Sequence, residues 1–404
     1  MENNFRSSIL SSFSIKVENL IYLLPLIATL GDWRIAGLYS LFLFFIFFTN
    51  SISNKQSKIR IPFFLSWVFL LLWGVYILQK SMSFYDGCLY YIGTIFIPFI
   101  IYVLINNVTI DKKFLNNFFN LFILSGVILS LYSIYVFADS GFDMKQRISS
   151  SWQDNNIVSL YLLTLFFFNL SFIVNKDKQD KLLFYLTSLL LLLLGIILTQ
   201  TRGVYVSMIF AIIIYLIKRP KIVIPSALIV IILVSVFSKV FEDRFLSIRY
   251  FGSDVSSLGR LQAWLSTLIL LKENLFMGYG FNAYYYLRDQ VFSFYFVEVQ
   301  HPHNTYLRSM LEIGLIGFLF YFSFFFRSIK FVFSKTAPEM EKYRKFIDGL
   351  KLTFLGCIPA FMFEPYFSLY GVSTIVLWIY ISIAIRLQYM NKIEIQNIKL
   401  SAIN

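Results

Sequence analysis

Apolar runs of about 20 residues recur along the whole 404-residue chain and are separated by short polar connections. One run of this length is what a helix needs to cross the hydrocarbon core of a bilayer. The pattern therefore predicts an all-α polytopic integral membrane protein with about twelve spans. The predicted spans cover residues 20–30, 35–49, 61–79, 88–106, 114–138, 157–175, 181–199, 203–217, 221–239, 305–327, 347–363 and 367–386.

Composition supports the membrane interpretation. The chain is 58% hydrophobic and 14% charged, whereas about 25% of the residues in a soluble globular protein are charged. Cys88 and Cys357 both lie in apolar surroundings, so we expect core residues rather than a disulfide or a metal pair. No basic stretch leads into a compact apolar segment with a cleavage site, and the first span is expected to act as an uncleaved insertion signal.

The net charge of +13 would suit a nucleic-acid-binding protein, but its distribution indicates a membrane protein. If both termini are cytoplasmic, the inner connections hold most of the 35 basic residues and fewer than half of the 22 acidic ones. This asymmetry is what the positive-inside rule predicts. We therefore expect membrane lipids around the protein, and no nucleic-acid partner.

One connection is far longer than the others. Residues 240–302 follow the ninth span, and the orientation places them outside. They include the amphipathic piece "LGRLQAWLSTLILLKENLF" (258–276), which is expected to lie against the membrane as a cap. Loops of this length are usually functional. No linker or internal repeat divides the chain, so we predict a single membrane domain over 1–404, with loop 240–302 capping an active site.

Several basic residues on the predicted outer face are not explained by the orientation rule. Arg202 stands in the tight turn "LTQTRGVYVSM", Arg260 opens the amphipathic piece, Arg147 lies in an outer loop, and Lys80 ends the third span. An arginine at a helix N-terminus is mildly unfavourable unless an anion lies nearby. These side chains would either converge on an anionic substrate or extend to lipid phosphates.

The two histidines of the chain, His301 and His303, flank a proline just before the tenth span. Asn304 is a candidate N-cap for a helix beginning near Thr305. The segment is therefore either a capping turn with two interfacial histidines or a site of proton transfer, because histidine titrates near neutral pH. Arg308 and Glu312 are four residues apart on the same helix and are interpreted as a structural pair. Gly314 and Gly317 are interpreted as a helix-packing pair.

The segment "HNTYLRSMLEIGLIG" resembles the hallmark of the O-antigen ligase and polymerase superfamily, in which His303 and Asn304 are followed after nine residues by Gly314 and then Gly317. The turn around Arg202 resembles the arginine turn of the family. The segment "GRLQAWLSTLILLKENLFMGYGFNAY" resembles its large-loop signature. The three matches occur in the expected order, between about residues 198 and 317.

The resemblance implies a GT-C-like glycosyltransferase in the bacterial inner membrane, with an active site that faces the periplasm. The donor would be a glycan on undecaprenyl pyrophosphate, and the acceptor a hydroxyl of the lipid A core. By this resemblance His303 is the general base, Arg202 and Arg260 hold the pyrophosphate, and Asn304 orients the base or the acceptor. No metal or other cofactor is expected.

Other features of the outer face stay open on sequence alone. Arg147 and Lys80 are expected to contribute to substrate binding if they reach the site. The stretch from Phe281 to Tyr286 would stack on sugar rings or pack within the cap. His301 matches no motif and is interpreted as incidental.

Two other functions fit parts of the pattern. A polysaccharide polymerase would use the same donor and the terminal sugar of another lipid-linked unit as acceptor. A flippase for lipid-linked oligosaccharides, a more remote alternative, would have a similar number of spans. The predicted spans hold essentially no buried ionisable residue, which favours an enzyme over a transporter. The paired carboxylates of a glycosidase are not evident.

Overall fold

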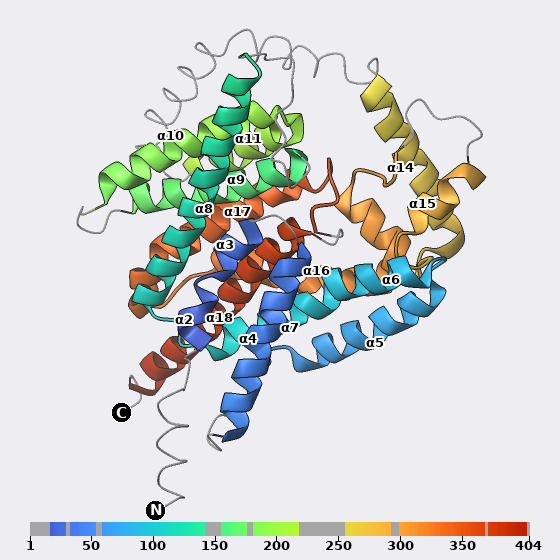
Figure 1. Cartoon of the computed structure of the whole chain (residues 1–404). Coiled ribbons are helices and arrows are strands. Elements are labelled where there is room, and N and C mark those ends of the chain that lie inside the picture. Colours follow the sequence, from blue (N-terminus) through green and yellow to red (C-terminus); the bar gives the residue numbers. More distant parts are fainter. Residues whose placement is uncertain are drawn as a thin grey trace, which may run out of the picture.

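The computed structural model describes residues 17–29, 33–53, 59–141, 155–175, 181–217, 255–291, 299–367 and 371–401 (Figure 1). Within these ranges the regular elements are all helical. In chain order they are α2 (Val17–Ile21), α3 (Leu24–Thr29), α4 (Trp33–Ser53), α5 (Phe64–Lys80), α6 (Phe84–Tyr91), the π-helical turn η1 (Ile92–Phe96), α7 (Ile97–Asn107), α8 (Lys112–Asp139), α9 (Asn155–Val174), α10 (Leu182–Thr199), α11 (Arg202–Ile217), α14 (Val255–Asn274), α15 (Ala283–Leu287), the 3-10 turn η2 (Arg288–Gln290), α16 (Thr305–Val332), the 3-10 turn η3 (Pro338–Tyr343), α17 (Arg344–Ala360) and α18 (Val372–Ser401).

Among the described residues, 7 helical segments are long and apolar enough to cross a membrane. They are α4, the continuous segment α6–η1–α7, α8, α9, α10, α16 and α18, and shorter apolar helices include α5 and α11. The prediction of a polytopic membrane protein is confirmed. Every predicted span except 221–239 overlaps a described helix, and that one lies outside the described residues. The number of crossings stays a prediction.

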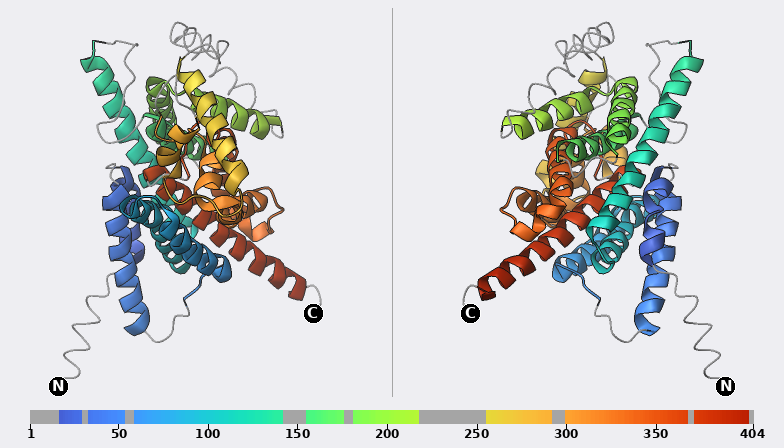
Figure 2. Two further views of the ribbon diagram at one scale, coloured as in Figure 1. Left: turned by 90° about the vertical axis from the view of Figure 1, so that its right-hand side faces the viewer. Right: turned by 90° about the vertical axis from the view of Figure 1, so that its left-hand side faces the viewer.

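Helix α18 forms the centre of the fold and contacts α7, α16, α3 and α9 (Figures 1 and 2). Its most apolar stretch is 83% buried, against 22% for that of α4. A helix that is apolar all round and buried belongs to the core. The exposed Leu38, Phe42 and Phe45 of α4 form an apolar outer surface of the kind that suits a lipid environment.

Helix α16 is interrupted at Gly314, whose φ of 68° lies in the left-handed region. The interruption leaves backbone groups without intrahelical partners, and the segment that follows α14 supplies replacements. The N–H groups of Tyr279 and Gly280 donate to the carbonyls of Leu311 (2.9 Å) and Glu312 (3.1 Å). In return, Leu315 N–H donates to Leu275 O at 2.8 Å. Exchanged bonds of this kind are what allow a broken helix in a membrane protein.

Glycine is required on both sides of this junction. A Cβ on Gly278, at φ 69°, would lie 2.5 Å from both Glu312 O and Gly314 N. A Cβ on Gly314 would collide with the carbonyl of Phe276. Gly314 therefore does not form the helix-packing pair expected from sequence, although Gly317 does pack against the Trp73 ring. The junction fixes α14 to α16, which carries the histidine turn at its start.

The expectation that the spans hold no buried ionisable residue is wrong. Arg308 and Glu312 are buried near the start of α16, and Asp348 is buried in α17. Arg308 Nε bonds Glu312 Oε1 at 2.8 Å, which confirms the expected structural pair. Asp348 accepts from Asn175 Nδ2 at 3.0 Å. These charges are tolerated because each has a polar partner. Buried charge therefore does not separate an enzyme from a transporter here.

Candidate active site

The turn that carries His303 is fixed on three sides. Asn304 caps α16 as expected, since its side chain accepts from Leu307 N–H at 3.0 Å. Trp264 Nε1, on α14, donates to Pro302 O at 2.8 Å. Thr305 N–H donates to Phe361 O, at the end of α17, at 2.7 Å. His303 itself has a φ of 48°, a conformation that non-glycine residues seldom adopt and that often marks a functional site.

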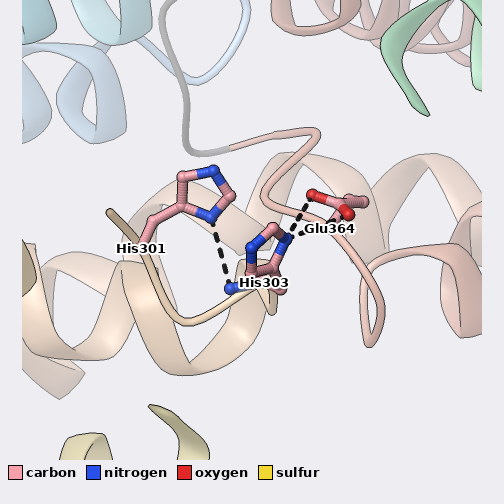
Figure 3. Close-up of side chains that lie close together, drawn as sticks. All are labelled: His301, His303 and Glu364. Atoms are coloured by element: carbon pink, nitrogen blue, oxygen red, sulfur yellow. Dashed lines mark hydrogen bonds and ion pairs between the residues drawn. The ribbon is translucent and has the colours of Figure 1, made fainter. Parts of the chain in front are cut away.

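The His303 ring points at Glu364, a residue of the connection between α17 and α18 (Figure 3). His303 Nδ1 lies 3.0 Å from Oε1 and 2.9 Å from Oε2 of the carboxylate. An ionised carboxylate only accepts hydrogen bonds, so Nδ1 carries the hydrogen. In the neutral ring the lone pair is then on Nε2, away from Glu364. This arrangement prepares Nε2 to accept a proton.

Glu364 is the residue on which the other groups converge. Its carboxylate is buried and also receives Arg260 Nη2 at 3.2 Å and Asn156 Nδ2 at 2.7 Å. Thr305 Oγ1 donates to its main-chain carbonyl at 2.6 Å. One carboxylate thereby joins the start of α9, the start of α14 and the histidine turn.

The turn before Arg202 also lies close to Glu364, through contacts with Asn156 and Phe363. Thr201 Oγ1, one residue before α11, donates to Asn156 Oδ1 at 3.4 Å. Gly203 lies against Phe363, where a Cβ would be 2.8 Å from the Cβ of that side chain. The half-buried Arg202 is therefore positioned beside residues that contact or adjoin Glu364. The structure thus brings the segments of His303, Arg260 and Arg202 together around one carboxylate.

Of the two remaining basic residues predicted for the site, the structure describes Lys80 but not Arg147. Lys80 Nζ donates to Gly278 O at 3.1 Å and lies 5.4 Å from the centre of the Tyr76 ring. These contacts connect the end of α5 to the α14–α16 junction. Arg147 lies outside the described residues. A substrate-binding role for either residue stays a prediction.

His301 is part of the site rather than incidental to it. Its Nδ1 accepts from the His303 main-chain N–H at 3.3 Å, and the two ring centres are 4.3 Å apart. Burial, followed by the charges of His303, Arg308 and Arg260, holds the pKa of His301 well below 6.5. His301 is therefore neutral at neutral pH.

His301, His303 and Glu364 also offer ligand atoms within 4.8 Å of one another, the arrangement of a candidate metal site. The surroundings do not favour a cation. The guanidinium of Arg260 and the amide of Asn156 both bond Glu364 Oε1, so a metal would have to displace them or lie beside a positive charge. We retain the prediction that no metal is needed.

Glu364 and Asn156 were not identified from the sequence. Glu364 stands 61 residues beyond His303, in a stretch with no motif, and Asn156 opens an unremarkable apolar helix. One signal was available for Glu364. It lies in the short outer connection between the last two predicted spans, on the predicted side of the histidines, where an acidic residue has no role in orientation.

These features define a class: a polytopic helical membrane protein in which a carboxylate-bound histidine and an arginine lie together beside a membrane helix. Residues 187–322, about a third of the chain, match the family model described as O-Antigen ligase (Wzy_C). The matched range contains Arg202, Arg260 and His303, and it ends before Glu364. No curated protein matches the chain. The resemblance to the ligase and polymerase superfamily is thereby confirmed, and it indicates a glycosyltransferase-type enzyme.

Proposed function

We propose that the protein is an O-antigen ligase of the bacterial inner membrane. It transfers a glycan from undecaprenyl pyrophosphate to a sugar hydroxyl of the lipid A core at the periplasmic face, without a metal. The observation that carries this proposal is the contact of His303 with the buried Glu364, which Arg260 also bonds. The match to the O-Antigen ligase family model over the same segments supports the reaction class.

His303 acts as the general base in this reaction. The acceptor hydroxyl loses its proton to Nε2 as its oxygen attacks the anomeric carbon of the donor sugar. Glu364 fixes the ring and stabilises the imidazolium that forms, the role of the carboxylate in other histidine-based sites. General-base catalysis contributes about 10²–10⁴ in rate. The proton then leaves His303 for water and the ring returns to its neutral form.

The arginines act on the leaving group. The bond between the anomeric carbon and the pyrophosphate oxygen breaks, and the negative charge stays on undecaprenyl pyrophosphate. Arg260 uses one N–H group on Glu364, and a guanidinium has five, so donors remain for phosphate oxygens. Arg202 is proposed to hold the second phosphate. Fixed donors around developing charge are among the largest contributions to enzymatic rate.

The experiment that tests the proposal compares lipopolysaccharide and lipid-linked glycan from a strain that lacks this gene. Accumulation of full-length glycan on undecaprenyl pyrophosphate, with none on the lipid A core, supports the ligase. A core that carries one repeat unit and no ladder identifies a polymerase. Export failure, with lipid-linked glycan retained on the cytoplasmic side, identifies a flippase.

Complementation with variants then tests the mechanism. His303→Ala should lower transfer by at least about 10²-fold while the protein still accumulates in the membrane. Arg344→Ala serves as the control, because its exposed pair with Glu341 lies on η3 and α17, away from the histidine turn. Wild-type transfer by His303→Ala would remove the general-base assignment.

A further inference from the structure

His301 also lines a cavity that does not include Glu364 among its described lining residues, and no part of the mechanism above uses this cavity. Its volume is about 520 Å³. The residues that line it share one property, since each side chain carries a hydrogen-bonding group. They are Asp86, Tyr90, Asn282, Tyr285, Tyr286, Gln300 and His301. Most ligand pockets are lined predominantly by apolar side chains with a few polar groups, so this lining indicates a ligand rich in hydroxyl groups.

The polar groups of the cavity are already fixed in position. Tyr286 Oη donates to Asp86 Oδ2 at 2.7 Å, and Asn282 Nδ2 approaches the same oxygen at 3.4 Å. Both contacts fall on Oδ2, which leaves Oδ1 to accept from a ligand. Tyr90 Oη donates to Asn282 Oδ1 at 3.4 Å. Because α6 and the cap hold each other in this way, the cavity forms before a ligand arrives, which lowers the cost of binding.

Tyr285 provides an aromatic surface at the cavity wall. Its side chain is 42% exposed although Phe281 and Tyr284, from the same stretch, are buried in the cap. The Tyr286 ring meets it edge-on, and the Arg288 guanidinium carbon lies 5.4 Å from its centre. The aromatic residues of the stretch therefore divide into Phe281 and Tyr284, which pack, and Tyr285 and Tyr286, which line the cavity.

The charge of this cavity differs from that of the region around Arg260 and Arg202. Among the lining residues that the structure describes, Asp86 and His301 are the ionisable side chains apart from tyrosines. Burial lowers the pKa of His301, so the described lining is negative through Asp86. Two arginines lie behind the wall, but each has an acidic partner. Arg308 pairs with Glu312, and Arg288 lies 3.5 Å from Asp289. Carboxylates and phosphates are therefore disfavoured here, whereas hydroxyl and ammonium donors are favoured.

The cavity is adjacent to the proposed base. His301 lines it and also lines a smaller space together with Asn156 and Glu364. The ring of His301 is 4.3 Å from that of His303, centre to centre. A sugar in contact with His301 would therefore lie close to the ring of His303.

We propose that this cavity, defined by Asp86, Tyr285 and His301, is the acceptor-sugar site, and that it selects a neutral or amino sugar over an acidic one. The proposal rests on the proposed function, since it assigns the acceptor to one side of His303 and the pyrophosphate donor to the other. Stacking on Tyr285 and hydrogen bonds to Asp86 Oδ1 supply recognition, and the negative charge supplies discrimination.

Binding of simple sugars tests the proposal without any transfer reaction. The full-length protein in nanodiscs is examined by saturation-transfer-difference NMR with methyl galactoside, methyl glucosaminide and methyl glucuronide. The wild type should give signals with the first two and not with the glucuronide. Tyr285→Ala should weaken binding about five-fold, as expected for loss of an aromatic stacking partner. Tyr85→Ala, an exposed neighbour of Asp86 outside the cavity lining, should bind as the wild type does.

Two further variants separate the outcomes. Asp86→Asn keeps an acceptor for Tyr286 and removes the charge, so binding of the glucuronide should appear. His303→Ala should retain sugar binding although transfer is lost, which distinguishes a failed acceptor site from a failed base assignment. Absence of any sugar signal in the wild type, or signals that Tyr285→Ala and Asp86→Asn leave unchanged, would overturn the proposal.

Discussion

Two arginine–glutamate pairs lie next to the histidine turn, and they differ in burial, geometry and partners. Arg308 and Glu312 belong to one helix, are 2.8 Å apart, and have side chains that are 1% and 3% exposed. Arg260 and Glu364 come from elements 104 residues apart, are 3.2 Å apart, and are 27% and 6% exposed. Among the described residues, the first glutamate receives Arg308 and the main-chain N–H of Asn282. The second also receives His303 and Asn156.

On the proposed function, the same two residue types serve stability in one place and chemistry in another. Arg308 is enclosed, with Glu312 on one side and the Tyr90 ring 4.9 Å away on the other. With 1% of its side chain exposed, Arg308 is not accessible to a substrate. Arg260 is partly open, so its remaining N–H groups are available to a substrate. A closed pair fixes the α14–α16 junction, and an open pair beside a histidine forms a site.

The largest effect is expected at the closed pair. Glu312→Ala leaves the buried Arg308 charge without a partner, which costs about 3–5 kcal/mol. Thermal unfolding in detergent should show a large loss of stability, or the protein should fail to accumulate. The double variant Arg308→Leu with Glu312→Leu should recover much of the stability, because it removes the uncompensated charge. A Glu312→Ala protein as stable as the wild type would show that the pair is not structural.

A somewhat smaller effect, seen in activity alone, is expected at the open pair. Glu364→Gln preserves shape but removes the charge that holds His303 and stabilises its protonated form. Transfer should fall by at least about 10²-fold, equivalent to about 2.7 kcal/mol, with little change in thermal stability. Equal losses of stability in Glu364→Gln and Glu312→Ala would abolish the distinction between the two pairs.

The smallest effect concerns His301, which lies between the pairs and whose pKa is lowered by burial first and then by His303 and both arginines. In the folded protein it stays neutral below pH 6.5, whereas in the unfolded chain it takes up a proton there. Folding stability should therefore fall as the pH drops below about 6.5. His301→Asn keeps an acceptor for the His303 N–H, so its melting temperature should fall less between pH 7 and 5. An identical pH dependence in both proteins would contradict the neutral assignment.

The sequence predicted what depends on local pattern. The apolar runs predicted the helices, Asn304 was predicted as the N-cap, and the spacing of Arg308 and Glu312 predicted their contact, because each of these interactions spans four residues or fewer. The motifs singled out the segments of His303, Arg202 and Arg260, which the structure brings together near Glu364. None of these predictions required knowledge of how distant helices pack.

What the sequence did not predict depends on distant contacts. Glu364 meets His303 only because α17 ends against Thr305, and no periodicity encodes that approach. The spacing of Gly314 and Gly317 is typical of packing glycines, and only the contact of Gly314 with Gly278 in the fold explains its left-handed conformation. The buried ion pair was expected to be structural, yet the burial itself was not expected, since burial depends on the cap that covers it.

The place of Glu364 on the connection between α17 and α18 also has a consequence for biosynthesis. A ribosome makes the arginine turn, the cap and the histidine turn before it makes this carboxylate, and membrane insertion follows the order of synthesis. Until α17 and α18 are in place, His303 lacks its partner and Arg260 lacks its anchor. On the proposed function, a nascent or truncated chain is inactive, and the proposed catalytic geometry forms only when α17 and α18 have joined the bundle.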